Sequence, residues 1–196
     1  MKQRLSTEER QRQIAAAALK LISERGVGGF TTAALAEEVD LAEGTIFRHF
    51  PNKQAIALAA IDQLEERLAE SFPGEDMPPL ERLGTFMRHR LRLVVAHRGV
   101  FRAFFSDQLG MAAGDEGVAK MERIKSESVD FLRQCLQDAA DEGQLRGGVS
   151  PEFLLRVIQG TVHAFLFGTS SSAGGDEEPG DIAGRTWSSL LKLIGR

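Results

Sequence analysis

The sequence contains no tyrosine, one cysteine and one tryptophan among its 196 residues. Because Cys135 is the only cysteine, no disulfide can form within the chain, which fits a reducing compartment. No apolar run approaches the roughly 18 residues that a membrane-spanning helix needs. The charged N-terminus is not followed by the apolar region of a secretory signal. These absences predict a cytoplasmic protein that has no membrane partner.

A large charge of either sign is also missing, since 24 basic and 28 acidic residues give a net charge of -4. This balance argues against a nonspecific nucleic-acid coat protein. The charges are unevenly placed, because residues 1–54 carry eight basic and seven acidic side chains while the rest of the chain is more acidic. If any part of the chain meets phosphate, this asymmetry indicates the N-terminal segment, where Lys2, Arg4, Arg10 and Arg12 cluster.

Apolar residues are plentiful, at 42% of the chain, and they recur at helical spacing. The pattern predicts a first helix over residues 8–25, capped by Ser6 or Thr7 and ended by the glycines of segment 26–29. Two short helices follow, one capped by Thr31 or Thr32 and one that begins near Glu43 and stops before Pro51. Further helices are predicted over residues 53–71, 80–97, 98–109, 118–142, 150–168 and 181–194.

The segments 110–117 and 169–180 are predicted to be loops, the second one flexible and polar. No segment alternates with a period of two for long enough to predict a strand. The fold class is therefore predicted to be all-α, with about nine helices. The proline-rich, acidic segment 72–79 is the best boundary between modules. It separates a predicted domain 1–71, which holds a helix-turn-helix at 31–50 and a linking helix at 53–71, from a second domain at 78–196.

A short helix, a tight turn and a second short helix form a common pattern that decides little alone. The amino-acid sequence of the second helix is more specific. The segment 44–53 (GTIFRHFPNK), preceded by Gly26 and by TTAALA at 31–36, resembles the DNA-binding domain of the tetracycline-repressor (TetR) family of transcription regulators. The resemblance covers about residues 8–60. It implies a three-helix DNA-binding domain followed by a helical domain for effector binding and dimerisation.

The resemblance also implies which residues contact DNA. Their chemistry agrees, because Gly44 lets the second helix approach base edges, Thr45 can donate a hydrogen bond, and Arg48 can pair with guanine or a phosphate oxygen. Lys53 would meet phosphate beside free amides at the start of the next helix. The predicted DNA-contacting residues are Thr31, Thr32, Glu43, Gly44, Thr45, Phe47, Arg48, His49 and Lys53.

Three residues depart from the family pattern and predict modest intrinsic affinity for DNA. Phe47 stands where the family often has tyrosine, and Ala33 stands where it often has arginine. Glu43 brings a negative charge toward DNA, which costs affinity unless it accepts from a cytosine amine. Avidity in a dimer would then supply the missing affinity. Phe47 and Phe50 could instead belong to the core, and His49 could be a simple surface histidine.

The family resemblance further implies an effector pocket in the C-terminal domain. Aromatic and flexible apolar side chains in the central helices would suit an apolar or aromatic effector. Ordinary core packing is the alternative for each of them, and a core or interface histidine is the alternative for His163. The candidate pocket residues are Phe86, Met87, Phe101, Phe104, Phe105, Met121, Phe131, Cys135 and His163.

Two apolar helices near the C-terminus predict an interface between two copies of the chain. The helix at 150–168 is apolar on most of its circumference, and three small residues four positions apart would let another helix approach closely. The alternative is that both helices complete the core of a monomer. The candidate interface residues are Gly160, Ala164, Phe165, Gly168, Trp187, Leu190, Leu191 and Ile194.

Together these features predict a homodimeric repressor that binds a palindromic double-stranded DNA operator and is released by an unidentified apolar or aromatic small molecule. No metal or cofactor is expected, and no enzyme activity, because the chain lacks a phosphate-cradling glycine loop, a nucleophile elbow and a metal-spaced histidine cluster. The alternatives are a helical ligand- or protein-binding module with weakened DNA binding, and a regulator that activates transcription.

Overall fold

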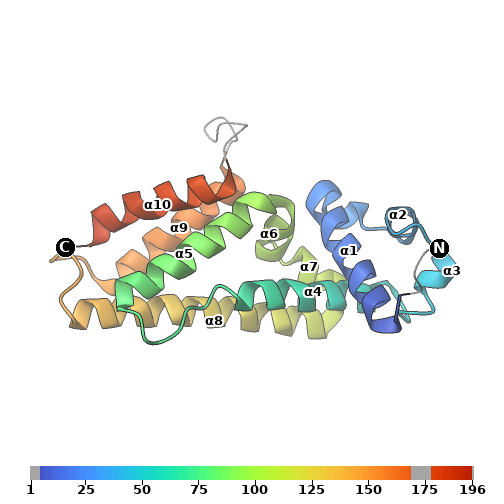
Figure 1. Ribbon diagram of the computed structural model, residues 1–196, viewed down its shortest axis with the longest axis horizontal. Coiled ribbons are helices and arrows are strands. Elements are labelled where there is room, and N and C mark those ends of the chain that lie inside the picture. The colour runs from blue at the N-terminus through green and yellow to red at the C-terminus, as the bar shows by residue number, and fades with distance from the viewer. Residues whose placement is uncertain (1–4, 169–177, 196) are drawn as a thin grey trace. The chain divides into compact units, whose positions relative to one another are not determined.

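The computed structural model describes residues 5–168 and 178–195, and within them it contains ten helices and no strand (Figure 1). The all-helical prediction is confirmed. The helices are α1 (Thr7–Gly29), α2 (Thr32–Glu38), α3 (Glu43–Ile46), α4 (Lys53–Ala69), α5 (Pro79–Ala96), α6 (Arg98–Phe105), α7 (Gln108–Ala112), α8 (Gly114–Asp141), α9 (Pro151–Phe167) and α10 (Pro179–Ile194). Lys2, Arg4 and most of the predicted 169–180 loop lie outside the described residues.

Side-chain caps begin several helices where the sequence predicts them. Ser6 forms a capping box at α1, because its hydroxyl accepts from the Glu9 amide at 3.1 Å and the Glu9 carboxylate accepts from the Ser6 amide at 2.7 Å. The Thr31 hydroxyl caps α2 through the Ala34 amide. Ser150 caps α9, with Pro151 at its first helical position.

The prediction of a loop at 110–117 is wrong, since α7 ends at Ala112 and α8 begins at Gly114. The glycines at 110 and 117 are buried and serve close packing: a Cβ at Gly110 would lie 3.3 Å from the Met121 side chain. The first helix also continues past its predicted end. Gly26 adopts a φ of 71° and kinks α1, which resumes and ends at Gly29.

The chain divides into two compact units. The first contains the residues up to Arg67 together with 98–124, and the second contains 68–97 together with the residues from Lys125 onward. Helix α8 thus contributes to both units. These units group residues by contact, and the predicted functional boundary at 72–79 remains a prediction about domains.

In the first unit, α1 packs against α2, α6 and α7. Its buried residues include Ile14, Leu21 and Ile22, which are fully inaccessible to solvent. An ion-pair cluster ties α4 to the start of α8. Lys120 of α8 pairs with Asp62 and, at 2.9 Å, with Glu65 of α4, and Arg123 pairs with Glu65 at 2.5 Å. These ion pairs therefore hold α4, the helix that follows the predicted helix-turn-helix, in place within the first unit.

In the second unit, α5 packs against both α9 and α10 (Figure 1). Helices α5 and α10 pack closely at Gly84, where a Cβ would lie 2.6 Å from the Trp187 ring. Trp187 is 4% exposed, so its indole fills the space that the glycine leaves. Arg82 and Arg90 also project from α5 toward this unit's aromatic residues, with guanidinium groups 5.6 Å from the Phe131 ring and 4.8 Å from the Phe86 ring respectively.

Candidate nucleic-acid interface

The predicted helix-turn-helix is formed by α2 and α3 and the turn between them. Asp40 turns the chain in the left-handed region, with a φ of 53°. The Leu41 amide donates to the Ala36 carbonyl at 3.0 Å, which closes the end of α2. Helix α3 is a single turn, and the residues after it continue as hydrogen-bonded turns up to His49.

Buried apolar residues hold the helix-turn-helix in place. Leu35 of α2, Val39 at the C-cap of α2 and Ile46 of α3 are at most 5% exposed. Phe50 is 6% exposed and so belongs to the core, as one of the sequence interpretations allowed. Such short helices are unstable alone, and this burial against their own unit holds them in place.

Most of the predicted DNA-contacting residues are exposed to solvent, and none of them is fully buried. Phe47 is 45% exposed, so its side chain is not a core residue. Three of the set are half-buried, and the others are exposed. The exposed members are Thr31, Glu43, Gly44, Phe47, Arg48 and Lys53, and the half-buried ones are Thr32, Thr45 and His49.

Two polar side chains follow Gly44, one in α3 and one in the turn after it. The Arg48 guanidinium donates to the Thr45 hydroxyl at 3.0 Å, which joins two of the predicted contacts. Nothing lies within 4 Å of a Cβ placed at Gly44, so this position is open. An open, side-chain-free surface beside a donor-rich arginine suits close approach to base edges or phosphate.

Lys53 lies at the first position of α4, where main-chain amides are unsatisfied by the helix itself. Its ammonium is 4.9 Å from the centroid of the Phe30 ring, which is fully buried. The Asn52 side chain caps α4 by accepting from the Ala55 amide at 2.8 Å. A cation held over a rigid ring at a helix N-terminus is well placed for a phosphate group.

His49 is held mainly through its backbone. Its carbonyl accepts from the Gln11 side chain of α1 at 2.9 Å, while its Nδ1 is buried and has no hydrogen-bond partner. Sequence reasoning missed Gln11, because a polar residue near the start of an amphipathic helix looks like ordinary solvated surface. Gln63 of α4 likewise donates to the Arg12 carbonyl at 2.7 Å. Two side-chain amides therefore join α1 to its neighbours, one to the segment after α3 and one to α4.

Comparison with known proteins agrees with this geometry. Residues 14–60 match the family model described as bacterial regulatory proteins, tetR family. The HTH-type transcriptional repressor KstR of Rhodococcus jostii RHA1 is 30% identical over 146 residues, which cover 70% of this chain and 65% of that protein. The chain belongs to the TetR family.

Two further relatives extend over most of this TetR-family chain. The nucleoid occlusion factor SlmA of Marinomonas sp. MWYL1 is 24% identical over 170 residues, covering 81% of this chain and 83% of that protein. The structure of the ketosteroid transcriptional regulator KstR2 of Mycobacterium tuberculosis superimposes with a TM-score of 0.79 at 17% identity, covering 99% of this chain and 97% of that one. The latter likeness shows the fold. None of these relatives indicates an enzyme family.

The predicted effector-pocket residues fall into the two compact units of this TetR-family chain. Phe101, Phe104, Phe105 and Met121 belong to the first, whereas Phe86, Met87, Phe131, Cys135 and His163 belong to the second. Most are buried in their own unit, but His163 is exposed and stacks near Phe167, with 5.3 Å between ring centroids. Burial raises the pKa of the Cys135 thiol to about 11.

The predicted interface residues also divide into two groups. Trp187, Leu190 and Ile194 are 5% exposed or less, so their side chains are core within the second unit. Gly160, Ala164, Gly168 and Leu191 are exposed and Phe165 is half-buried. Phe153 and Phe167, which sequence reasoning did not select, are 58% and 52% exposed on α9. Helix α9 therefore carries an apolar face that its own unit leaves uncovered.

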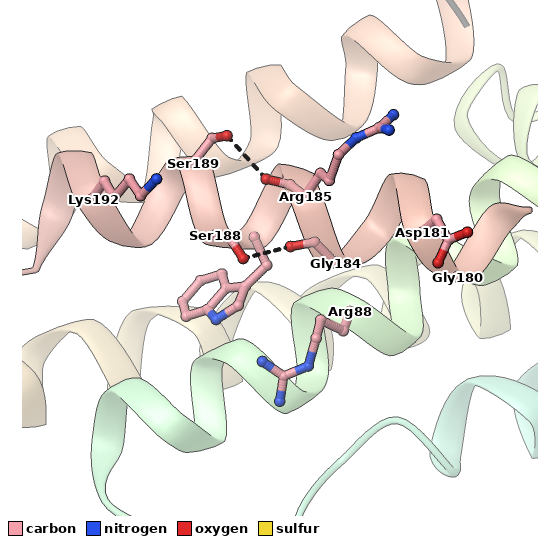
Figure 2. Close-up of a pocket in the computed structure, with 9 residues that line it drawn as sticks. Arg88, Gly180, Asp181, Gly184, Arg185, Ser188, Ser189 and Lys192 are labelled. Atoms are coloured by element: carbon pink, nitrogen blue, oxygen red, sulfur yellow. Dashed lines mark hydrogen bonds between the residues drawn. The ribbon is translucent and has the colours of Figure 1, made fainter. Parts of the chain in front are cut away.

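An open groove of about 740 Å³ lies between α5 and α10 in the second unit (Figure 2). Arg88 from α5 and Asp181, Arg185, Trp187 and Lys192 from α10 are among the residues that line it, so its lining mixes charged and apolar groups. The Ser188 and Ser189 hydroxyls donate to carbonyls of their own helix at 2.9 Å, so they are largely occupied. None of the predicted effector-pocket residues lines this groove.

The part of the chain that the structure describes has neither a metal-ligating cluster nor a membrane-spanning helix. There, no group of three or more histidine, cysteine, aspartate or glutamate side chains could hold a metal ion. No described helix is both long and apolar enough to cross a bilayer.

Proposed function

We propose that this chain is a transcriptional repressor that acts as a homodimer, binds a palindromic operator and leaves it when a small molecule binds the C-terminal domain. The observation that carries the proposal is the difference in burial between two sets of residues in the helix-turn-helix. Its apolar residues are buried, while six of its nine predicted DNA-contacting residues are exposed and the position of Gly44 is open. The repressor KstR, similar over 146 residues, supports repression as the direction of control.

The exposed face of α9 supports the homodimer. It combines Phe153 and Phe167 with small residues at Gly160 and Ala164. An apolar helix face with small residues at its centre packs well against a symmetric copy of itself. Two-fold symmetry of the protein then requires a palindromic operator.

Release by a small molecule requires two states that differ in their affinity for DNA. The effector must bind the DNA-free state more tightly, by a factor that equals the loss of operator affinity. The aromatic residues of the second unit, Phe72, Phe86 and Phe131, pack with ring centroids 4.8–5.3 Å apart and supply the apolar chemistry expected of the effector site.

The test is an electrophoretic mobility shift with the purified chain and the DNA upstream of its own gene. We expect a sequence-specific complex at nanomolar to micromolar protein, with a footprint centred on an inverted repeat. A control duplex with one half-site scrambled should bind much more weakly. Binding that is equal for all duplexes would contradict the proposal.

A second candidate function is supported by SlmA, a nucleoid occlusion factor that matches 81% of this chain. A factor of that kind would occupy many sites dispersed over the chromosome, whereas a local repressor would occupy one or a few promoters. Chromatin immunoprecipitation with sequencing separates the two. A module with decayed DNA binding would give no peaks, and an activator would give promoter peaks with falling transcription when the gene is deleted.

A further inference from the structure

Arg90 is a buried cation of the second unit. It lies on α5 and is only 9% exposed. Its guanidinium is 4.8 Å from the centroid of the Phe86 ring and 5.4 Å from that of Phe72. One terminal nitrogen donates to the Ser128 hydroxyl of α8 at 3.2 Å, and Nε is buried without an acceptor. The guanidinium therefore presents several N–H donors, and the neutral Ser128 hydroxyl is a weak acceptor for one of them.

No carboxylate among the described residues forms a salt bridge with Arg90. Arg82 lies about two turns earlier on the same helix. Arg82 approaches the Phe131 ring of the same aromatic cluster, but Asp138 of α8 lies 3.6 Å from its guanidinium. Two arginines thus enter the cluster, and only one brings a counter-charge. Burying a charge without a partner is costly, so a buried arginine normally has one.

The chemistry of arginine keeps this charge in place. Desolvation lowers the pKa of Arg90 to about 10, which still leaves the guanidinium protonated at neutral pH. The cost of burial is therefore not relieved by losing a proton. The two aromatic faces compensate in part through cation–π attraction. They leave the in-plane N–H donors, which are those that bind oxyanions, without a full set of acceptors.

We propose that Arg90, set among Phe72, Phe86 and Phe131, binds the carboxylate of an organic acid whose apolar or aromatic body packs against these rings. The inference rests on the proposed function, because this acid would be the effector, and it narrows that effector from an apolar molecule to an anionic one. A planar carboxylate matches the guanidinium fork with two parallel hydrogen bonds. Ser128 orients the fork through its hydrogen bond.

The number of charges favours a carboxylate over a phosphate. A phosphate group carries between one and two negative charges at neutral pH and is usually met by several cations. The cluster offers one unpaired guanidinium, since Arg82 is already neutralised by Asp138. An acyl coenzyme A thioester, whose anionic groups are phosphates, is the other source of oxyanions, and the experiment includes it.

The test measures thermal shifts and calorimetric affinities of the full chain with named probes: benzoate, phenylacetate and decanoate, their neutral amides, and phenylacetyl coenzyme A. We expect at least one free acid to raise the melting temperature and its amide to have no such effect. Arg90→Met should weaken binding of that acid by about 10- to 150-fold, because hydrogen bonds to charged groups are lost. Arg90→Lys should retain part of the affinity.

The melting temperature of the ligand-free protein distinguishes a ligand-binding role of Arg90 from a purely structural role. If Arg90 awaits an anion, Arg90→Met removes an uncompensated buried charge, and the ligand-free variant should melt at the same temperature or higher. If Arg90 only supports the fold, the ligand-free variant should melt lower. Arg92→Met, an exposed arginine on the same helix, is the matched control and should leave both measurements unchanged.

Three outcomes would overturn the inference: no free acid stabilises the protein, the amides bind as well as the acids, or only the coenzyme A thioester binds. Operator binding is measured in parallel with every variant. Acid binding without any specific DNA binding would contradict the proposed repressor and leave the carboxylate site standing. Normal DNA binding with no response to carboxylates would contradict the carboxylate site alone.

Discussion

The Arg48 guanidinium donates a 3.0 Å hydrogen bond to the hydroxyl of Thr45, which lies three residues earlier in helix α3. In the DNA-free protein this bond holds an exposed cation close to the helix surface beside the open position of Gly44. The bond is exposed to water, so exchanging it for a contact with DNA costs little. Arg48 is therefore both pre-positioned and available.

Arg48→Ala is expected to weaken operator binding by about 10- to 100-fold per half-site while leaving the melting temperature nearly unchanged. The direction of the specificity change identifies the contact. If Arg48 reads a base, discrimination at one operator position falls; if it binds phosphate, affinity falls equally for all sequences. The measurement is a mobility shift with the operator and single-base variants. The control Arg92→Ala removes an exposed arginine of α5 and should bind like the wild type.

Lys53→Gln is expected to reduce affinity uniformly, because the ammonium at the start of α4 is placed for phosphate and not for a base edge. The logarithm of the association constant falls linearly with the logarithm of the salt concentration. Losing one phosphate contact should make this slope shallower by about 0.9 per protomer. The loss of the contact with Phe30 should cost only about 0.5–1 kcal/mol of folding stability. Fluorescence anisotropy over about a sixfold range of salt, roughly 50 to 300 mM, measures the slope. An unchanged slope would place Lys53 away from DNA.

The sequence predicted the helices and the caps well where local chemistry decides them. Ser6, Thr31 and Ser150 cap helices because their hydroxyls satisfy nearby amides, which is a local property of the chain. The error at 110–117 arose because glycine often marks a loop. Here Gly110 and Gly117 allow close packing instead, and only the tertiary fold distinguishes these two uses.

The candidate sites show the same limit. Trp187 and Leu190 lie on an apolar helix face, and sequence cannot tell whether such a face meets its own chain or a second copy. The fold places both in the core, whereas it leaves Phe153 and Phe167 exposed. Arg90 was missed for a similar reason. An arginine in an amphipathic helix looks like a solvated residue until α8 and the aromatic cluster are placed over it.

Ala164→Glu is expected to convert the proposed dimer into a monomer. The residue is exposed in the protomer, so the variant should fold, but its carboxylate would be buried against its symmetric copy. Light scattering coupled to size-exclusion chromatography gives the mass, and operator affinity should fall because the two half-sites lose their linkage. The matched control Ala119→Glu changes an exposed alanine of α8. A variant that remains dimeric would move the interface away from this face of α9.

Gly84→Ala is expected to destabilise the second unit, since the new Cβ would lie 2.6 Å from the Trp187 ring. Trp187 is 4% exposed and tightly enclosed, so α5 and α10 must separate or the indole must leave its preferred rotamer, at a cost of about 1–3 kcal/mol. Urea unfolding followed by tryptophan fluorescence measures the loss, because Trp187 is the only tryptophan. Gly184→Ala on α10 is the matched control: nothing lies within 4 Å of its Cβ, and the substitution should stabilise the helix by about 0.5–1 kcal/mol. Equal stability of the two variants would mean that the two helices adapt to the extra methyl group, and that their packing does not require a glycine at position 84.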